Sequence, residues 1–248
     1  MRVSFMTDTG RTRSQNQDAV FATCEPIGCL SNLFVIADGM GGHNAGDYAS
    51  RKAIDLMRES IAVSGEQEAV SVIQQGITIA NEVIYQEASL DVSKAGMGTT
   101  MVVATMDGDV LRVANVGDSR LYVLTKGCLQ QVTRDHSVIE EMVRKGEVSK
   151  EVAQHHPKRN LITRAVGAEE QVRVDFFDLD LQDVDAVLMC SDGLTNMLED
   201  RRIAEILSLD MNLDNKVATL VEEANLAGGK DNITVLVIEE MMDEVKVC

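Results

Sequence analysis

Residues 38–43 read Asp-Gly-Met-Gly-Gly-His, and they follow directly on the apolar run Leu-Phe-Val-Ile-Ala at 33–37. An apolar run of this length that ends in a turn signal predicts a buried strand. The glycines let the backbone approach a ligand closely, so a carbonyl oxygen can join the Asp38 carboxylate as a cation ligand. A tight strand-to-helix turn with a solvated Asp and His is the alternative interpretation of this stretch.

Comparable settings recur elsewhere in the chain, and together they hold five aspartates: Asp18, Asp38, Asp118, Asp192 and Asp231. Four of the five border the end of an apolar strand and have a glycine beside or near them. Strand ends that pack in one core can converge at one edge of the sheets. The spacing in the sequence does not by itself prove that these strand ends do so.

Carboxylates gathered in one place repel one another unless cations neutralise them. An all-oxygen ligand set without convincing His or Cys ligands suits Mg²⁺ or Mn²⁺ better than Zn²⁺. Two such ions, about 3.5–4 Å apart, would generate a hydroxide and polarise a phosphoryl oxygen. Convergence of the aspartates would therefore create a two-metal hydrolytic site.

Arg13 precedes Asp18 in the polar segment Arg-Ser-Gln-Asn-Gln-Asp. An arginine this close to a carboxylate is commonly part of a surface ion pair. Arginine is also the side chain best shaped to hold a phosphate through two parallel hydrogen bonds. Both interpretations of Arg13 remain open at this point.

Composition excludes several classes of protein. The 248 residues include 45% hydrophobic residues and carry a formal net charge of −17, which argues against a nucleic-acid partner because phosphate binding rests on Lys and Arg. The cysteines, at 24, 29, 128, 190 and 248, form no CxxC pair and indicate reduced thiols. No signal peptide is recognisable, and no apolar run approaches the roughly 18 residues of a membrane span. We therefore expect a cytoplasmic protein without a membrane partner.

Apolar periodicity gives the expected order of elements. Strands are predicted at 3–7, 19–23, 33–37, 99–106, 110–116, 121–124, 129–132, 171–180 (an edge strand), 186–190 and 233–238. Helices are predicted at 45–62, 67–89, 137–146, 200–208 and 213–227. We interpret His155-His156-Pro157 as a solvated loop, because adjacent histidines do not easily face one ion. Without repeats or linkers, the pattern predicts one domain over 1–248, with 137–165 as an exposed subdomain.

Eight short motifs in order carry a resemblance to a known family. They are Arg13-Ser-Gln-Asn-Gln-Asp18, Ala37-Asp-Gly-Met-Gly-Gly-His43, Gly98-Thr-Thr100, Asn115-Val-Gly-Asp-Ser-Arg120, Asp135-His-Ser137, Thr163-Arg-Ala-Val-Gly167, Ser191-Asp-Gly-Leu-Thr195 and Lys230-Asp-Asn-Ile-Thr234. This series resembles the metal-dependent PP2C-type (PPM) protein phosphatases, and most closely the compact bacterial serine/threonine phosphatases. Any one motif is weak evidence, but the matches keep their order over residues 13–234.

The resemblance implies an α+β fold, a four-layer αββα sandwich of two mainly antiparallel β-sheets flanked by helices. It also implies that the stretch 137–165 is the variable flap near the active site. It further implies hydrolysis of phosphoserine and phosphothreonine in proteins by a metal-bridging hydroxide, without a phosphoenzyme. The implied partners are phosphorylated proteins and a eukaryotic-like Ser/Thr kinase that the phosphatase opposes in bacterial signalling. Nothing in the sequence indicates an obligate interface, so we expect a monomer.

The resemblance further assigns ligands for two Mn²⁺ or Mg²⁺ ions, with a third, weaker site. By this resemblance Asp38 bridges both ions and Gly39 supplies a backbone carbonyl. Asp192 and Asp231 complete the first ion's protein ligands, and Asp18 supports the second ion. Asp118 joins Asp192 at the third site.

Substrate-handling roles are implied for Arg13, which would clamp the phosphate, and for a general acid. Some family members have a histidine where this chain has Met40, and the bacterial type has one three residues later. The resemblance therefore carries the general-acid role to His43, with a metal-bound water as the alternative proton donor.

Two other functions remain to be distinguished. A metal phosphohydrolase for small metabolites would prefer sugar or nucleotide phosphates over phosphopeptides. A non-catalytic phosphoprotein-binding module on the same fold would be expected to lose metal-site aspartates, all of which are present here. Nucleotide binding through glycines 39–42 is disfavoured because neither GxGxxG nor a Walker sequence occurs.

Overall fold

The computed structural model describes residues 1–42, 45–149, 152, 156 and 161–239. The strands are β1 (Arg2–Asp8), β2 (Asp18–Thr23), β3 (Leu33–Met40), β4 (Gly98–Thr99), β5 (Met101–Asp107), β6 (Val110–Val116), β7 (Arg120–Thr125), β8 (Cys128–Gln131), β9 (Asp175–Asp180), β10 (Ala186–Cys190) and β11 (Ile233–Glu239). The helices are α1 (Ala45–Val63), α2 (Ala69–Leu90), the 3-10 helix η1 (Val92–Lys94), α3 (Val138–Arg144), α5 (Asp192–Thr195), α6 (Asp200–Leu207) and α7 (Leu213–Leu226).

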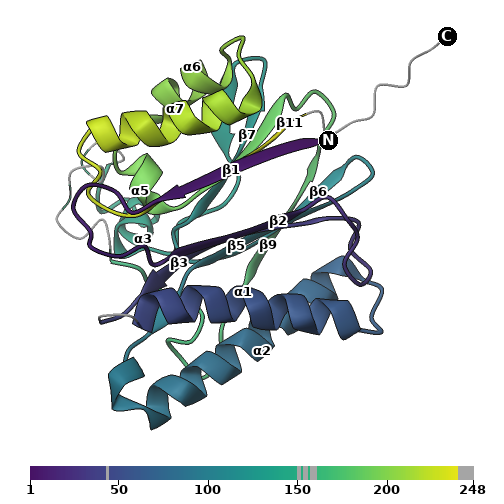
Figure 1. Ribbon diagram of the computed structural model, residues 1–248, viewed down its shortest axis with the longest axis vertical. Helices are drawn as coiled ribbons and strands as arrows, with labels where there is room; N and C mark the ends of the chain where they lie inside the picture. The colour runs from purple at the N-terminus through teal and green to yellow at the C-terminus, as the bar shows by residue number, and fades with distance from the viewer. Residues whose placement is uncertain (43–44, 150–151, 153–155, 157–160, 240–248) are drawn as a thin grey trace.

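Two antiparallel sheets form the middle of the molecule (Figure 1). One has the strand order β1-β11-β10-β7-β8, and the other has the order β2-β3-β5-β6-β9 with β4 beside β3. Helices α1 and α2 cover the outer face of the second sheet, and α6 and α7 cover the outer face of the first. This arrangement confirms the expected α+β sandwich of four layers.

Each sheet is apolar on both faces because each is packed on both sides. Phe34 and Ile36 of β3 point into the layer between the sheets, where Met189 and Leu236 of the other sheet meet them. Val35, with its neighbours on the same face of β3, packs under α1 and α2. Successive side chains of a strand point to opposite faces. The continuous apolar runs in the sequence are therefore the mark of strands buried on both faces.

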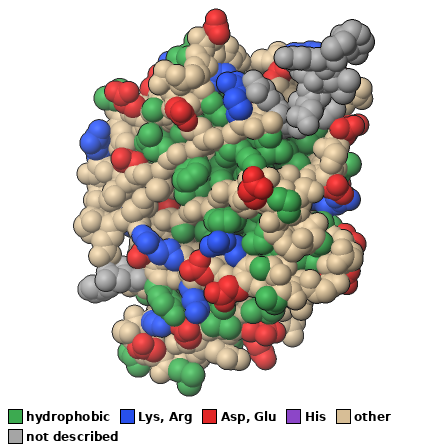
Figure 2. Space-filling view, turned by 45° about the vertical axis from the view of Figure 1, so that its right-hand side comes forward, with side chains coloured by type: hydrophobic (Ala, Val, Ile, Leu, Met, Phe, Trp, Pro, Cys, Tyr) green, Lys and Arg blue, Asp and Glu red, His purple; other side chains and the backbone are tan. Residues whose placement is uncertain are grey.

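Surface charge contributes little to this architecture. Figure 2 shows acidic and basic side chains next to one another below an apolar region on one face of the molecule. Among the described ion pairs, those of Arg51 with Asp47 and of Arg201 with Glu205 lie within single exposed helices. Exposed pairs of this kind stabilise a fold by at most about 1 kcal/mol. Stability rests mainly on the buried apolar layers.

Strand β3 is longer than the apolar run predicted. It continues to Met40, because Gly39 and Met40 pair with Thr99 and Gly98 of β4 while Asp38 lies opposite Asp18 of β2. The prediction ended the strand at residue 37 because no apolar pattern marks this extension. The first two predicted aspartates consequently face each other across two paired strands.

Other differences are small. The predicted edge strand at 171–180 lies at the sheet edge, but it begins at Asp175. Its antiparallel partner β6 ends nearby, and Asn115 is the last residue of β6 that pairs with it, opposite Asp175. The helix predicted at 137–146 spans Val138–Arg144, with the Ser137 side chain capping its start. Helix α5 and helix η1 were not predicted.

Residues 43–44, 150–151, 153–155, 157–160 and 240–248 lie outside the described part of the chain. Of the predicted loop His155-His156-Pro157 only His156 is described, and nine residues of the predicted flap (150–151, 153–155 and 157–160) lie outside the described part. The single domain with a flap at 137–165 stays a prediction. No helix among the described residues is both long enough and apolar enough to cross a membrane.

The start of α5 supplies a test of the packing at this edge. A β-carbon at Gly193 would lie 1.9 Å from the carbonyl oxygen of Asn232, and the backbone there is held by β10 and β11. We expect Gly193→Ala to lower the free energy of unfolding by about 1–3 kcal/mol through overpacking. Urea unfolding of the purified variant measures this change.

Gly65→Ala is the matched control, because no atom lies within 4 Å of a β-carbon at this exposed position. Its unfolding midpoint should equal that of the original chain. An unchanged midpoint for Gly193→Ala would show that the contact between α5 and the segment before β11 is not close.

Candidate functional site: an acidic pocket at the strand ends

A pocket of about 240 Å³ lies where several strands of both sheets end. Its lining is Arg13, Gln17, Asp38, Gly39, Met40, Gly41, Thr100, Asp118, Ile162, Asp192, Asp231 and Asn232. Six of the eight predicted site residues are in this lining. Of the other two, Asp18 lies directly beside Asp38 on the neighbouring strand, and His43 lies outside the described residues.

Asp38 is held through its own backbone. Its N–H donates to Thr100 Oγ1 (2.9 Å), and its carbonyl accepts from the Thr100 N–H and from Thr99 Oγ1 (both 2.9 Å). A β-carbon at the next residue, Gly39, would lie 2.0 Å from the carbonyl oxygen of Gly46. Only glycine therefore allows helix α1 to start this close to the strand that carries Asp38.

Asp18 is buried beneath the pocket, with 4% of its surface exposed. One carboxylate oxygen, Oδ2, accepts hydrogen bonds from Ser191 Oγ and Thr234 Oγ1, each at 2.7 Å. The other oxygen, Oδ1, is buried without a hydrogen-bond partner. A buried carboxylate oxygen left unpaired is costly, and a cation or an ordered water would satisfy it.

Asp192 follows β10 of the opposite sheet, and Asp118 lies on the turn that connects the two sheets. Asp192 is the first residue of α5 and accepts a hydrogen bond from Asn196 Nδ2 (2.8 Å). Asp118 lies between β6 and β7, is 8% exposed, and follows Gly117, whose φ of +106° favours glycine. These residues bring carboxylates from both sheets to one pocket.

Arg13 and Asp231 meet at the pocket mouth. Arg13 Nη2 donates to Asp231 Oδ2 at 2.8 Å, and the two side chains are 53% and 27% exposed. The structure thus places Arg13 both in an ion pair and in the pocket lining. The two interpretations left open by the sequence are compatible.

Asn232 is a site residue to which the sequence analysis gave no role. Its Oδ1 accepts from the Gln17 N–H (2.8 Å), and its Nδ2 donates to the carbonyls of Thr9 and Gln15 (both 2.9 Å). The side chain is 4% exposed and binds the segment that carries Arg13 to the start of β11. Its position in the Lys-Asp-Asn-Ile-Thr motif pointed to this residue, but the motif does not reveal its hydrogen-bond partners, which lie more than 200 residues away in the sequence.

Burial and mutual repulsion raise the pKa values of the clustered carboxyls. Burial, the largest cause, raises the pKa of Asp18 to about 7, against the opposing effect of its two hydroxyl donors. Burial followed by the nearby Asp231 charge raises the pKa of Asp192 to about 6. The pKa values of Asp38 and Asp118 are also raised, first by burial and then by neighbouring aspartates. The pocket therefore favours protons or other cations.

The donors present fit a hard divalent cation. Carboxylates and backbone carbonyls are the ligands that Mg²⁺ and Mn²⁺ prefer, and Asp18 Oδ1 lacks a partner. No group of three or more His, Cys, Asp or Glu side chains is arranged to hold a metal ion within the part of the chain that the structure describes. Mg²⁺ commonly keeps several waters and uses only one or two protein carboxylates, so a cluster of three is not required.

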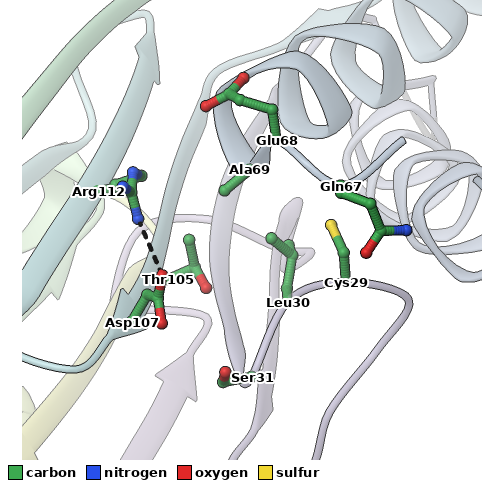
Figure 3. A pocket seen from close by; sticks show the side chains of 9 residues that line it. All are labelled: Cys29, Leu30, Ser31, Gln67, Glu68, Ala69, Thr105, Asp107 and Arg112. Atoms are coloured by element: carbon green, nitrogen blue, oxygen red, sulfur yellow. Dashed lines mark ion pairs between the residues drawn. The ribbon is translucent and has the colours of Figure 1, made fainter. Parts of the chain in front are cut away.

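A second pocket, of about 190 Å³, lies elsewhere, between the start of α2 and the ends of β5 and β6 (Figure 3). Arg112 there lies 3.6 Å from Asp107 and 4.0 Å from Asp178. None of the predicted site residues lines this pocket. It supplies residues for control variants.

The raised pKa values predict how stability changes with pH when divalent cations are removed. A carboxyl whose pKa is higher in the folded chain stabilises the fold at low pH, and this contribution is lost as pH rises through that value. Between pH 5.5 and 8, passing the values near 6 and 7, we expect the metal-free protein to lose at least ~4 °C in Tm. Mn²⁺ should reduce this loss.

Asp18→Asn separates this effect from the general repulsion of an acidic protein. The amide keeps the shape of the carboxyl but cannot ionise, so the metal-free variant should show a smaller fall in Tm between the two pH values and less stabilisation by Mn²⁺. An identical fall in Tm for Asp18→Asn and the original chain would contradict the assignment of the titration to this pocket.

Comparison with known proteins agrees with this geometry. A family model described as protein phosphatase 2C matches residues 9–225. The serine/threonine phosphatase stp of Listeria monocytogenes serotype 4b is 42% identical over 247 residues, covering 96% of each chain. The protein phosphatase PhpP of Streptococcus pneumoniae serotype 2 is 36% identical over 243 residues, covering 96% of this chain and 97% of its own.

A solved structure supports the same assignment. The crystal structure of the serine/threonine phosphatase Stp1 from Staphylococcus aureus has a TM-score of 0.89 and 33% sequence identity, covering 96% of this chain and 94% of its own. The matches extend over nearly the whole chain rather than a single motif. They show that the chain belongs to the protein phosphatase 2C family.

Proposed function

We propose that this protein removes phosphate from phosphoserine and phosphothreonine in other proteins, using two divalent cations held in the acidic pocket. Family membership makes it a serine/threonine protein phosphatase. The observation that carries the cation proposal is the meeting of aspartates from both sheets at one pocket, together with the unpaired Oδ1 of Asp18. A phosphate group would be repelled by these carboxylates unless cations were bound.

The proposed ligands are those that the sequence resemblance assigned. Asp38, the Gly39 carbonyl, Asp192 and Asp231 would hold one Mn²⁺ or Mg²⁺ ion, and Asp38 and Asp18 would hold or support the second. When bound, the ions supply a hydroxide nucleophile and polarise the phosphoryl oxygens. Asp118 and Asp192 would hold a third, weaker ion.

Arg13 is proposed to hold the substrate phosphate. Its guanidinium lies at the pocket mouth, where the bond to Asp231 uses Nη2 and orients the side chain toward the acidic site. A planar guanidinium can donate two parallel hydrogen bonds to phosphate oxygens. Asp231 would thereby link cation binding to the position of the phosphate.

His43 is proposed as the general acid that protonates the departing Ser or Thr oxygen. Met40 lines the pocket, and a thioether cannot donate a proton. The proposal for His43 therefore rests on the sequence motif. The physiological setting that we propose is cytoplasmic, with a monomeric phosphatase acting on phosphoproteins and opposing a Ser/Thr kinase.

Phosphate release from a phosphothreonine peptide tests the cation requirement. We expect release with Mn²⁺ or Mg²⁺, and none with EDTA. Asp38→Asn and Asp192→Asn should each lower kcat/KM by at least about 100-fold, because each removes a charge that would hold the cations. A fall of less than about threefold at saturating Mn²⁺ would overturn the ligand assignment.

Asp107→Asn is the matched control, since this carboxylate lines the second pocket and pairs only loosely with Arg112. Its kcat/KM should stay within about twofold of the original value. The same assay with sugar and nucleotide phosphates distinguishes a protein phosphatase from a hydrolase of small metabolites, which would turn these over faster than the phosphopeptide.

Replacement of Arg13 tests phosphate binding separately. Arg13→Ala should raise KM for the phosphopeptide about tenfold or more, while Arg13→Lys retains the charge but not the paired hydrogen bonds and should be intermediate. Because the ion pair is half exposed, the free energy of unfolding should change by less than about 1 kcal/mol. Arg201→Ala, on the exposed face of α6, is the control and should leave KM unchanged.

A further inference from the structure

The turn that carries Asp118 is bound by a residue outside the pocket lining. The Gly117 N–H donates to His136 Nδ1 (3.1 Å), and the His136 N–H donates to the Gly117 carbonyl (2.9 Å). Asn115 Nδ2 lies 3.3 Å from the same carbonyl. The backbone N–H and the backbone carbonyl of Gly117, next to Asp118, are thus both bound by His136.

The opposite edge of the His136 ring is fixed as well. His136 Nε2 lies 3.1 Å from Asp175 Oδ2, and Arg164 Nη1 donates to Asp175 Oδ1 at 2.8 Å. Because Nδ1 accepts a hydrogen bond, the neutral ring carries its proton on Nε2 and donates it to Asp175. The ring is 6% exposed, and its burial lowers the pKa of His136, which favours this neutral form.

The backbone of the same residue reaches a second wall of the pocket. The Thr163 N–H donates to the His136 carbonyl at 2.7 Å, and the Val138 N–H donates to the Leu161 carbonyl at 2.8 Å. Ile162, between these two bonded residues, lines the acidic pocket. His136 therefore contacts both the turn before Asp118 and the segment at 161–164.

We propose that His136 is a positioning residue that joins these two walls and holds the Asp118 carboxylate in place for cation binding. The inference rests on the proposed function, since it takes Asp118 as a cation ligand. His136 itself touches neither a cation nor the substrate in this proposal. It acts through the backbone N–H and carbonyl of Gly117, whose φ of +106° favours glycine.

A purely structural role for His136 makes a different prediction. If the ring only filled its space, its loss would lower stability without a specific effect on cation binding. Residues that orient a metal ligand typically change metal affinity about 10–100-fold when they are replaced. The affinity for Mn²⁺, measured by calorimetry on the protein alone, separates the two roles.

Two substitutions at this position separate its two hydrogen bonds. In His136→Asn the amide oxygen can take the place of Nδ1 and accept from Gly117, while the bond to Asp175 is lost. In His136→Gln the amide nitrogen can take the place of Nε2, while the acceptor for Gly117 is lost. We expect His136→Gln to weaken Mn²⁺ binding at the weakest site about tenfold or more, and His136→Asn by less than about threefold.

Asn81 offers a matched control. Its Oδ1 accepts from the Gly167 N–H at 2.7 Å, its side chain is 1% exposed, and it lies outside the acidic pocket. Asn81→Ala therefore removes a buried acceptor from a glycine N–H without touching the Asp118 turn. It should lower Tm and leave Mn²⁺ affinity unchanged.

A double-mutant cycle completes the test. If His136 acts through Asp118, then the effects of His136→Gln and Asp118→Asn on Mn²⁺ affinity are not additive. Unchanged affinity in His136→Gln, equal losses in both His136 variants, or additive effects in the cycle would each overturn the proposal. Because binding is measured without substrate, a failure of the phosphopeptide assay would overturn the proposed function and leave this result unaffected.

Discussion

Repulsion between buried carboxylates is the constraint on which the arrangement of this molecule depends. Asp18 and Asp38 come from two strands and Asp192 from the start of α5, yet they lie close enough for each to influence the ionisation of another. The donors that reach Asp18 and Asp192 are neutral hydroxyls and an amide rather than cationic side chains. Neutral donors fix the geometry without cancelling the charge. Excess negative charge is thereby kept at one defined place.

Rigid backbone surroundings hold this unfavourable cluster together. Close approaches at Gly39 and Gly193, and the saturated hydrogen bonding of Asn232, fix the strand ends from several sides. Arg120 shows the same principle outside the pocket, since its guanidinium binds Asp135 at both carboxylate oxygens and so secures the segment leading to His136. Three apolar layers bury both faces of both sheets and stabilise the fold around this cluster.

Much of the fold could be predicted from residue patterns, because double-sided burial leaves continuous apolar runs such as 33–37 and 186–190. Ordered motifs added the sandwich architecture and the candidate residues. The extension of β3 could not be predicted, since it depends on pairing with β4, about 60 residues later. The roles of Asn232 and His136 could not be predicted either, because a side chain that binds backbone groups of distant segments leaves no periodic pattern in the sequence.

Strand β11 lies between β1 and β10, although it is the last strand of the described chain. Strand β1 therefore gains its hydrogen-bonded neighbour only after β11 has been synthesised. Asp231 and Asn232 directly precede β11, so a nascent chain lacks both the closed sheet and a complete acidic pocket until this strand has been made. A product that stops before Asp231 therefore lacks one carboxylate of the pocket as well as the hydrogen-bonded neighbour of β1.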